Sequence, residues 1–578
     1  MPKLSEYFDY QLDSAGEPYM QVSIKGAALL RLPATNKGTA FSLQERIDLG
    51  LDGLLPPFVA NLEHQIDRLY LNFQKQPDDI SKYQFLISIL DRSEVLFYAL
   101  LERHLQEMVP IVYTPTIGQA VQQFSALYNR ARGLTLSIEN INRAESILEN
   151  YPLHDIRMLV VTDASAILGI GDQGMGGLAI CIGKLALYTA GGGLCPFQTV
   201  PVNLDVGTNR AELLNDPLYL GMHESRLSGD AYFELVDKFV AAVKNKWPKA
   251  IIQWEDFAKN VAFDVLARYR DQIPCFNDDI QGTGAVALAG LLSACRLKAQ
   301  PLTQQIVVVA GAGAGGIGVA SLIKEGMIRA GLSEAEARLQ IYVVDACGLV
   351  VQSENTDSYK MGLAHNPDIY KDWNIVKSHQ PNLLEVLTHT KPSVLIGLSG
   401  VAGLFTEEMI KSMAENHTNP IIFPLSNPTD NCEAHPKNIV EWTQGRAIIS
   451  TGSPFAEVEY QGRHYSIGQG NNAFIFPGLG FAAILGECSR ITDDMVLEAA
   501  YALAEYTEQH CLSAGHIYPP VSDLKKVSLI VASKVLAKAL EDGSATRQDL
   551  NSMDLDAYVK NNFWQAKHLP FKYKANAS

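Results

Sequence analysis

The spacing of apolar residues predicts helices in the first part of the chain. Over residues 58–108, apolar side chains recur three or four positions apart, which is the period of amphipathic helices. Ser42 stands three residues before Glu45, the pattern of a capping box, and predicts a helix that begins after Ser42. Residues 1–35 have a mixed pattern that predicts surface segments. We therefore expect a helical N-terminal region over residues 1–110.

From about residue 156 the pattern changes to short apolar runs of strand length, separated by segments of helical length. Strands that alternate with helices predict an α/β fold with parallel strands. After residue 491 the pattern is helical again. The candidate strands occupy residues 158–163, 200–205, 305–310, 341–345, 393–398, 420–425 and 447–451.

Length and charge exclude several classes of protein. A chain of 578 residues is too long for one core and predicts two or more globular domains. The 63 acidic and 47 basic residues give a net charge of −16, which argues against binding to nucleic acid or to anionic membranes. Eight scattered cysteines without a CxxC pair predict a reducing compartment. With no leader and no spanning apolar stretch, we expect a cytoplasmic protein.

Two pairs of carboxylates follow short apolar runs. Glu255 and Asp256 end the run at 251–254, and Asp278 with Asp279 follows the run at 273–276. Several carboxylates buried close together need a cation or protons. Oxygen ligands without a nearby pair of cysteines or histidines favour Mg²⁺ or Mn²⁺ over zinc. The alternative is that these acids cap helices, because Asp before a small-residue helix is a common N-cap.

A glycine-rich loop predicts a dinucleotide site. Gly311, Gly313 and Gly316 follow a predicted strand and precede a helical segment, and Asp345 ends the next strand, where an acid binds a ribose hydroxyl. Residues 169–174 also match GxGxxG, but in a less suitable context. Because no Lys or Arg directly follows Asp345, we expect NAD rather than NADP.

Other polar residues occupy places where substrates bind. Tyr113 lies between two prolines on a segment predicted to be extended, which makes it a proton donor or a core tyrosine. Asn427 follows a predicted strand at its C-terminal edge. Asn471 and Asn472 lie between glycines, where amides are commonly turn residues.

Several long motifs together resemble those of the large-subunit malic enzymes. The resemblance extends from Asn36 to Trp564. It predicts four regions: a helical region at 1–110, a substrate and metal domain at 111–283, a Rossmann-type NAD domain at 284–470, and a helical region at 471–578 that returns to the substrate domain. The motifs occupy residues 112–116, 167–174, 183–185, 254–257, 276–283, 426–429 and 470–474.

The resemblance implies a role for each candidate residue. Glu255, Asp256 and Asp279 would hold Mg²⁺ or Mn²⁺, with Asp278 beside them in the catalytic site. Lys184 would be the general base and Tyr113 the general acid. The remaining candidates would bind ligands: Gly311, Gly313, Gly316, Asp345, Asn427 and Asn471 the cofactor, and Asn427 and Asn472 the substrate.

The resemblance implies NAD-dependent oxidative decarboxylation of (S)-malate to pyruvate and CO2 by a homodimer or homotetramer. Many malic enzymes have a substrate-binding arginine where this chain has Ala166, and the sequence does not select a replacement between Arg210 and Arg226. Malolactic enzymes, which resemble the chain in some segments, also lack that arginine and convert malate to lactate and CO2 with retained NAD. Arg68 and Arg92 fall where some members bind an activating dicarboxylate, although surface ion pairing explains them equally well.

Overall fold

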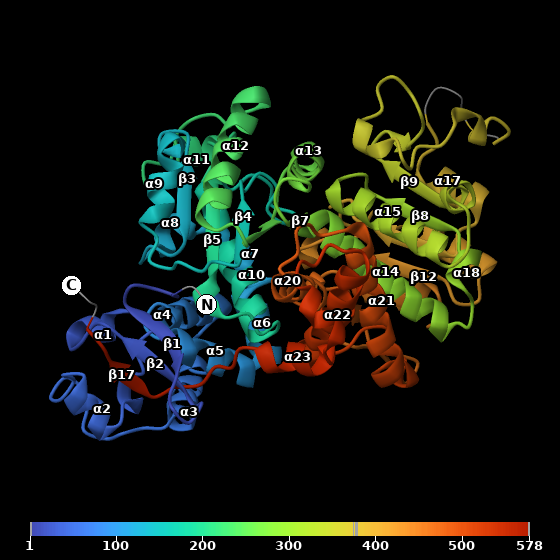
Figure 1. Ribbon diagram of the computed structural model, residues 1–578. Coiled ribbons are helices and arrows are strands. Elements are labelled where there is room, and N and C mark those ends of the chain that lie inside the picture. The colour runs from blue at the N-terminus through green and yellow to red at the C-terminus, as the bar shows by residue number, and fades with distance from the viewer. Residues whose placement is uncertain (1–2, 374, 376–379, 576–578) are drawn as a thin grey trace. The chain divides into compact units, whose positions relative to one another are not determined.

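The computed structural model describes residues 3–373, 375 and 380–575 (Figure 1). Its contacts separate two compact units. Unit 1 consists of Met1–Ser165, Asp172–Gln253 and Lys560–Ser578, and unit 2 consists of Ala166–Gly171 and Trp254–Val559. The four regions predicted from the sequence stay a finer prediction.

One helix of unit 1 begins at the cap that the sequence predicts. The capping box of Ser42 and Glu45 is formed at the start of α2. The helices are α1 (Ala27–Arg31), α2 (Leu43–Asp48), α3 (Leu62–Phe73), α4 (Asp79–Leu90), α5 (Glu94–Arg103), α6 (Leu105–Val112), α7 (Thr116–Gln122), α8 (Phe124–Leu127), α9 (Ala144–Glu149), α10 (Leu178–Ala190), α11 (Ala211–Leu214) and α12 (Gly229–Lys246).

Parallel strands form the core of unit 1. The strands β3 (Leu134–Ser137), β5 (Thr199–Asp205), β4 (Met158–Thr162) and β6 (Ile251–Trp254) follow one another in this order across the sheet. Every residue of β4, β5 and β6 is buried, as expected for strands covered on both faces. The apolar runs therefore predicted β4, β5 and β6 correctly, whereas β3 was not predicted.

The N-terminal region is not purely helical, which corrects the prediction of surface segments over residues 1–35. β1 (Phe8–Leu12) and β2 (Pro18–Val22) form an antiparallel hairpin, and β17 (Phe571–Tyr573) pairs with β2 in parallel. The C-terminal tail is thus part of unit 1.

The segment before Tyr113 is helical rather than extended. α6 contains Pro110 and ends at Val112, and Tyr113 is its C-cap residue. Proline cannot donate to the carbonyl four residues earlier, which belongs to the exposed Gln106 and can be solvated. The buried apolar face of α6 outweighs the local cost of proline.

Unit 2 contains a sheet with the order β10-β9-β8-β11-β12-β13-β16 in the described residues. All neighbouring strands are parallel except β10 and β9. This is the Rossmann-type arrangement predicted from the glycine loop. The strands are β8 (Val307–Ala310), β9 (Ile341–Asp345), β10 (Gly348–Leu349), β11 (Val394–Gly397), β12 (Ile421–Pro424), β13 (Ile448–Thr451) and β16 (Gly468–Gln469), with a separate hairpin of β14 (Val458–Tyr460) and β15 (Arg463–Tyr465) and the short strand β7 (Cys275–Asn277).

The helices of unit 2 include one long apolar stretch. In the described chain only 278–297 is long and apolar enough to span a membrane, but 83% of its most apolar window is buried, as in a core helix. The helices are α13 (Lys259–Tyr269), α14 (Thr283–Leu297), α15 (Ala314–Arg329), α16 (Glu334–Leu339), α17 (Leu383–Thr390), α18 (Glu407–Asn416), α19 (Pro436–Trp442), α20 (Phe476–Leu485), α21 (Asp493–His510), α22 (Leu524–Glu541) and α23 (Leu555–Asn562), and a π-helical turn at Asp278–Gly282 precedes α14.

Candidate functional site

Three of the four predicted acids meet in unit 2. Glu255 and Asp256 directly follow β6, and Asp279 lies in the π-helical turn. One oxygen from each of the three carboxylates lies within 4.8 Å of the other two. Glu255 and Asp256 are buried and Asp279 is half-buried. Three carboxylates this close need a cation or protons to offset their charge, and an all-oxygen donor set suits Mg²⁺ or Mn²⁺.

The backbone around Asp256 is shaped for this cluster. Asp256 has a φ of 57°, a left-handed conformation that is uncommon for a residue with a side chain. Its N–H donates to Asp279 Oδ2 at 2.8 Å. Its carbonyl accepts from the N–H of Ala166 at 3.0 Å, and its Oδ1 accepts from the N–H of Leu168 at 3.5 Å. Uncommon backbone conformations of this kind cluster at functional sites.

The loop at 166–171, which carries part of the first GxGxxG match, therefore contacts the acid cluster. A Cβ at Gly169 would overlap the side chain of Asn431 and the carbonyl of Asn427, so the glycine is required by close packing. The loop at 169–174 is followed by a short 3-10 turn at Gly174–Gly177 rather than directly by a long helix. The contact of this loop with the acid cluster agrees with the prediction that the other glycine loop, at 311–316, binds the dinucleotide.

The acids at 278 and 279 are not helix caps. The N-cap of the π-helical turn is Asn277, whose Oδ1 accepts from the N–H of Ile280 at 2.9 Å. Asp278 is fully buried, and its Oδ2 accepts from Asn472 Nδ2 at 2.6 Å. The capping role that competed with metal binding is thus filled by a residue that the sequence analysis did not single out.

The two other predicted amides have protein partners. Asn427 Oδ1 accepts from Ser453 Oγ at 2.5 Å. Asn471 Oδ1 accepts from the N–H of Ala473 at 2.9 Å and so caps the turn at Asn472–Phe474. Asn471 has the turn role that its glycine-flanked position indicated, while Asn472 reaches the acid cluster through Asp278.

The second glycine loop joins β8 to α15, as the motif requires. Gly311 has a φ of 119°, and a Cβ at Gly316 would overlap the carbonyl of Gly311. A Cβ at Gly313, by contrast, would meet nothing within 4 Å among the described residues, so this side of the loop is open to a ligand. The loop ends at the N-terminus of α15, where backbone N–H groups favour phosphate.

Asp345 ends β9 and has a cationic neighbour that the sequence analysis missed. Lys360 Nζ lies 3.0 Å from Asp345 Oδ2 and 2.9 Å from Asp357 Oδ2. Burial acts to lower the pKa of Lys360, but these two carboxylates outweigh it and raise the pKa above its ordinary value. The inference of NAD considered only residues adjacent to Asp345, and Lys360 lies fifteen positions further along.

Lys184 and Tyr113 lie together in unit 1. Lys184 is fully buried on α10, and its Nζ lies 5.1 Å from the centre of the Tyr113 ring. Tyr113 is 4% exposed. A Cβ at Gly183 would come within 2.7 Å of the Val112 carbonyl, so this glycine lets α10 approach α6 closely. The predicted base and acid are thus neighbours.

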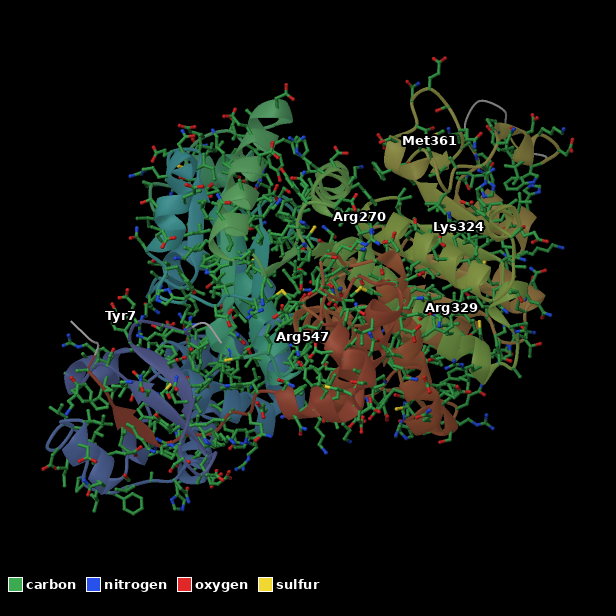
Figure 2. All side chains as sticks on the ribbon, in the orientation of Figure 1. Tyr7, Arg270, Lys324, Arg329, Met361 and Arg547 are labelled. Carbon is green, nitrogen blue, oxygen red and sulfur yellow. The ribbon has the colours of Figure 1, made fainter. Side chains whose placement is uncertain are left out.

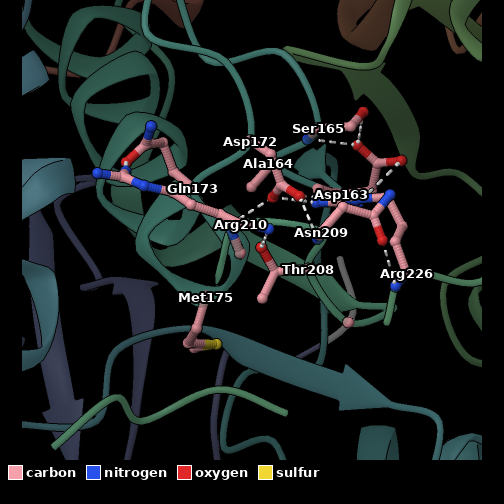
Figure 3. Close-up of polar contacts among 12 residues, drawn as sticks. Asp163, Ala164, Ser165, Asp172, Gln173, Met175, Thr208, Asn209, Arg210 and Arg226 are labelled. Atoms are coloured by element: carbon pink, nitrogen blue, oxygen red, sulfur yellow. Dashed lines mark hydrogen bonds and ion pairs between the residues drawn. The ribbon is translucent and has the colours of Figure 1, made fainter. Parts of the chain in front are cut away.

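Arg226 contacts two acidic residues of unit 1 (Figure 3). Its Nη2 lies 2.6 Å from Asp172 Oδ1, and its Nη1 donates to the Asp163 carbonyl at 2.8 Å. Arg210 is more exposed, and its Nη1 donates to Gln173 Oε1 at 2.7 Å. Both candidates for the missing cation at Ala166 already have carboxylate partners. Arg210 Nε lies 3.3 Å from Oε2 of the exposed Glu212, whereas the partners of Arg226 are more buried.

Comparisons with known proteins agree over most of the chain. Residues 90–270 match the family described as malic enzyme, N-terminal domain, and residues 280–540 match the family described as malic enzyme, NAD binding domain. The chain is 43% identical to the NAD-dependent malic enzyme of Acinetobacter baylyi, over 96% of this chain and 97% of that protein. It is also 43% identical to the Escherichia coli protein of the same name, over 96% and 98%.

Among solved structures, malic enzyme from Entamoeba histolytica has a similar fold. The two align with a TM-score of 0.56 and 22% identity, over 89% of this chain and 91% of that chain.

Proposed function

The chain belongs to the malic enzyme family, and on this premise we propose that it catalyses NAD-dependent oxidative decarboxylation of (S)-malate to pyruvate and CO2. The observation that carries the proposal is the cluster of Glu255, Asp256 and Asp279 in unit 2, in the same chain as a buried lysine next to a tyrosine in unit 1. The two sets of residues correspond to the metal, base and acid motifs of the family.

Glu255, Asp256 and Asp279 would hold Mg²⁺ or Mn²⁺. When bound, the ion supplies a Lewis acid for the substrate oxygen and stabilises negative charge as CO2 leaves. Asp278, fixed by Asn472, adds a fourth carboxylate beside these ligands. The loop at 311–316 and Asp345 would bind NAD, which accepts the hydride from C2 of malate.

Lys184 would take the proton from the C2 hydroxyl of malate. The amine must be neutral to accept that proton, and its full burial keeps it away from solvent. After CO2 has left, Tyr113 would protonate C3 of the resulting enolate, giving pyruvate. Its burial beside Lys184 excludes water, so the proton comes from a fixed group rather than from solvent.

Product analysis tests the reaction. Incubation with malate, NAD and Mn²⁺ should release CO2 and produce equal amounts of pyruvate and NADH. Lactate without net NADH would instead assign the malolactic reaction, for which Ala166 is the motivating residue and which the comparisons do not favour. Absence of turnover with metal present would contradict both.

Variants test the assigned roles. Lys184→Ala should lose turnover and still bind NAD, while Asp279→Asn should lose Mn²⁺ binding measured without malate. Unchanged rates in Lys184→Ala would reject the lysine as base. We also propose a cytoplasmic homodimer or homotetramer, which light scattering after gel filtration would check.

A further inference from the structure

Gln281 spans the turn that carries two of the acids. It is the fourth residue of the π-helical turn Asp278–Gly282 and is 7% exposed. Its Oε1 accepts from the backbone N–H of Asn277 at 3.0 Å. Because Asp278 and Asp279 lie between these two residues, the hydrogen bond closes a ring around both acids.

The arrangement is a capping box moved by one position. In an ordinary capping box the N-cap side chain accepts from the third residue, whose own side chain accepts from the N-cap N–H. Here Asn277 accepts from the third residue, Ile280, but its N–H is bound by the fourth, Gln281. The wider π-turn explains the shift, since it adds one residue to the turn. Asn277 is fully buried, so loss of this partner would be costly.

The other end of the Gln281 amide is also held. Its Nε2 donates to Asp493 Oδ1 at 3.3 Å, and the same oxygen accepts from Arg270 Nη2 at 2.8 Å. Asp493 is the first residue of α21, where an acid is favoured by the helix dipole. Arg270, labelled in Figure 2, is the C-cap residue of α13. The amide is therefore fixed between the buried turn and a surface ion pair.

We propose that Gln281 is a positioning residue for the metal site: it orients Asp278 and Asp279 through the Asn277 N–H, and Asp493 orients Gln281. The inference rests on the proposed function, because it assumes that Asp279 is a metal ligand. Gln281 touches neither metal nor substrate in this role, so its effect should appear in metal affinity.

The experiment measures Mn²⁺ affinity of the full-length protein without malate, from the free ion seen by electron paramagnetic resonance. Gln281→Leu, which puts an apolar side chain in place of the amide, should weaken Mn²⁺ binding by about tenfold, as replacement of outer-shell partners of metal ligands commonly does. The kcat measured at saturating Mn²⁺ should fall much less than the affinity, which separates positioning from a role in proton transfer.

Two neighbouring surface acids, Asp493 and Asp494, supply a test variant and its matched control. The Asp493 side chain is 64% exposed, so Asp493→Ala should fold normally. It should weaken Mn²⁺ binding by about threefold, because the Gln281 amide loses the acceptor of its Nε2. Asp494→Ala, the next residue, removes an equally exposed acid near Lys538 and should leave the affinity unchanged. Equal affinities in the two variants would overturn the part assigned to Asp493.

Two variants separate the role of Gln281 from the metal site itself. Wild-type affinity in Gln281→Leu, together with lost binding in Asp279→Asn, would overturn the role of Gln281 alone. Retained binding in Asp279→Asn would instead overturn the metal site.

Discussion

Replacing Arg226 by methionine should destabilise the protein, because it removes the guanidinium and keeps most of the aliphatic chain. The side chains of Arg226 and Asp163 are 11% and 1% exposed, and that of Asp172 is 20% exposed. Breaking a buried pair leaves an uncompensated charge and costs about 3–5 kcal/mol. Since Asp172 is partly solvated, we expect the lower end, about 3 kcal/mol.

Equilibrium unfolding in urea measures this cost as a shift of midpoint at unchanged slope. Arg226→Lys keeps the charge but not the planar fork that serves Asp172 and the Asp163 carbonyl together, so it should cost about 1–2 kcal/mol. Arg210→Met is the matched control: that side chain is 35% exposed, and its loss should cost less than about 1 kcal/mol.

The pH dependence adds a second check. Burial acts to raise the pKa of Asp172, but the hydrogen bond and charge of Arg226 and two backbone N–H groups outweigh it, so the pKa lies below its ordinary value. A lowered carboxyl pKa contributes stability above the unfolded pKa, and this is lost as the pH falls through the folded value. The difference in the free energy of unfolding between wild type and Arg226→Met should therefore become smaller at acidic pH. A cost below about 1 kcal/mol at pH 7, or one that does not change in acid, would refute the reasoning.

Three further predictions concern other parts of the chain. Asp345→Ala should raise the KM for NAD. It should also free Lys360 to bind the 2′-phosphate of NADP, so that kcat/KM for NADP rises relative to kcat/KM for NAD in steady-state assays. Gly318→Ala should cost about 1–3 kcal/mol in urea and weaken Mn²⁺ binding, because the added Cβ would overlap the Ile280 carbonyl in the acid-bearing turn. Burial lowers the pKa of His568 to about 4, so stability should fall between pH 6.5 and 4, and the melting temperature of His568→Gln should depend less on pH there.

Two of the three have a control variant elsewhere in the chain. Gly326 lies on the same helix as Gly318, but its Cβ would meet a movable side-chain carbon of Leu288, so Gly326→Ala should leave Mn²⁺ binding intact. Glu354 is an exposed acid, and Glu354→Ala is the control for the NAD prediction. An unchanged KM for NAD in both Asp345→Ala and Glu354→Ala would reject the contact between Asp345 and the ribose. A pH profile identical in His568→Gln and wild type would reject the role of His568.

The strands of both units could be predicted because their signal is local. Buried parallel strands are continuous apolar runs, and β4 and β9 begin and end within a residue of the runs that predicted them. The capping box at Ser42 is likewise contained in four residues. The glycine loop was identified because its strand, helix and acid follow in fixed order.

What the sequence could not predict depends on partners far along the chain. β17 pairs with β2 across more than 540 residues, and neither strand is apolar enough to be recognised alone. Pro110 argued locally against a helix before Tyr113, but the buried face of α6 decides the conformation. Lys360 reaches Asp345 only through the fold of an intervening loop.

The turn before α14 has a capping arrangement that the sequence rule for a capping box does not identify. A capping box read from sequence pairs the N-cap with the third residue, and from Asn277 that residue is the apolar Ile280, so no box is expected. The π-turn moves the partner to Gln281, so that Ile280 lies inside the ring together with Asp278 and Asp279. An α-turn there would have paired the cap with a residue that cannot bind it. The turn type and the glutamine therefore require each other, and changing the glutamine should alter metal binding before it alters the fold.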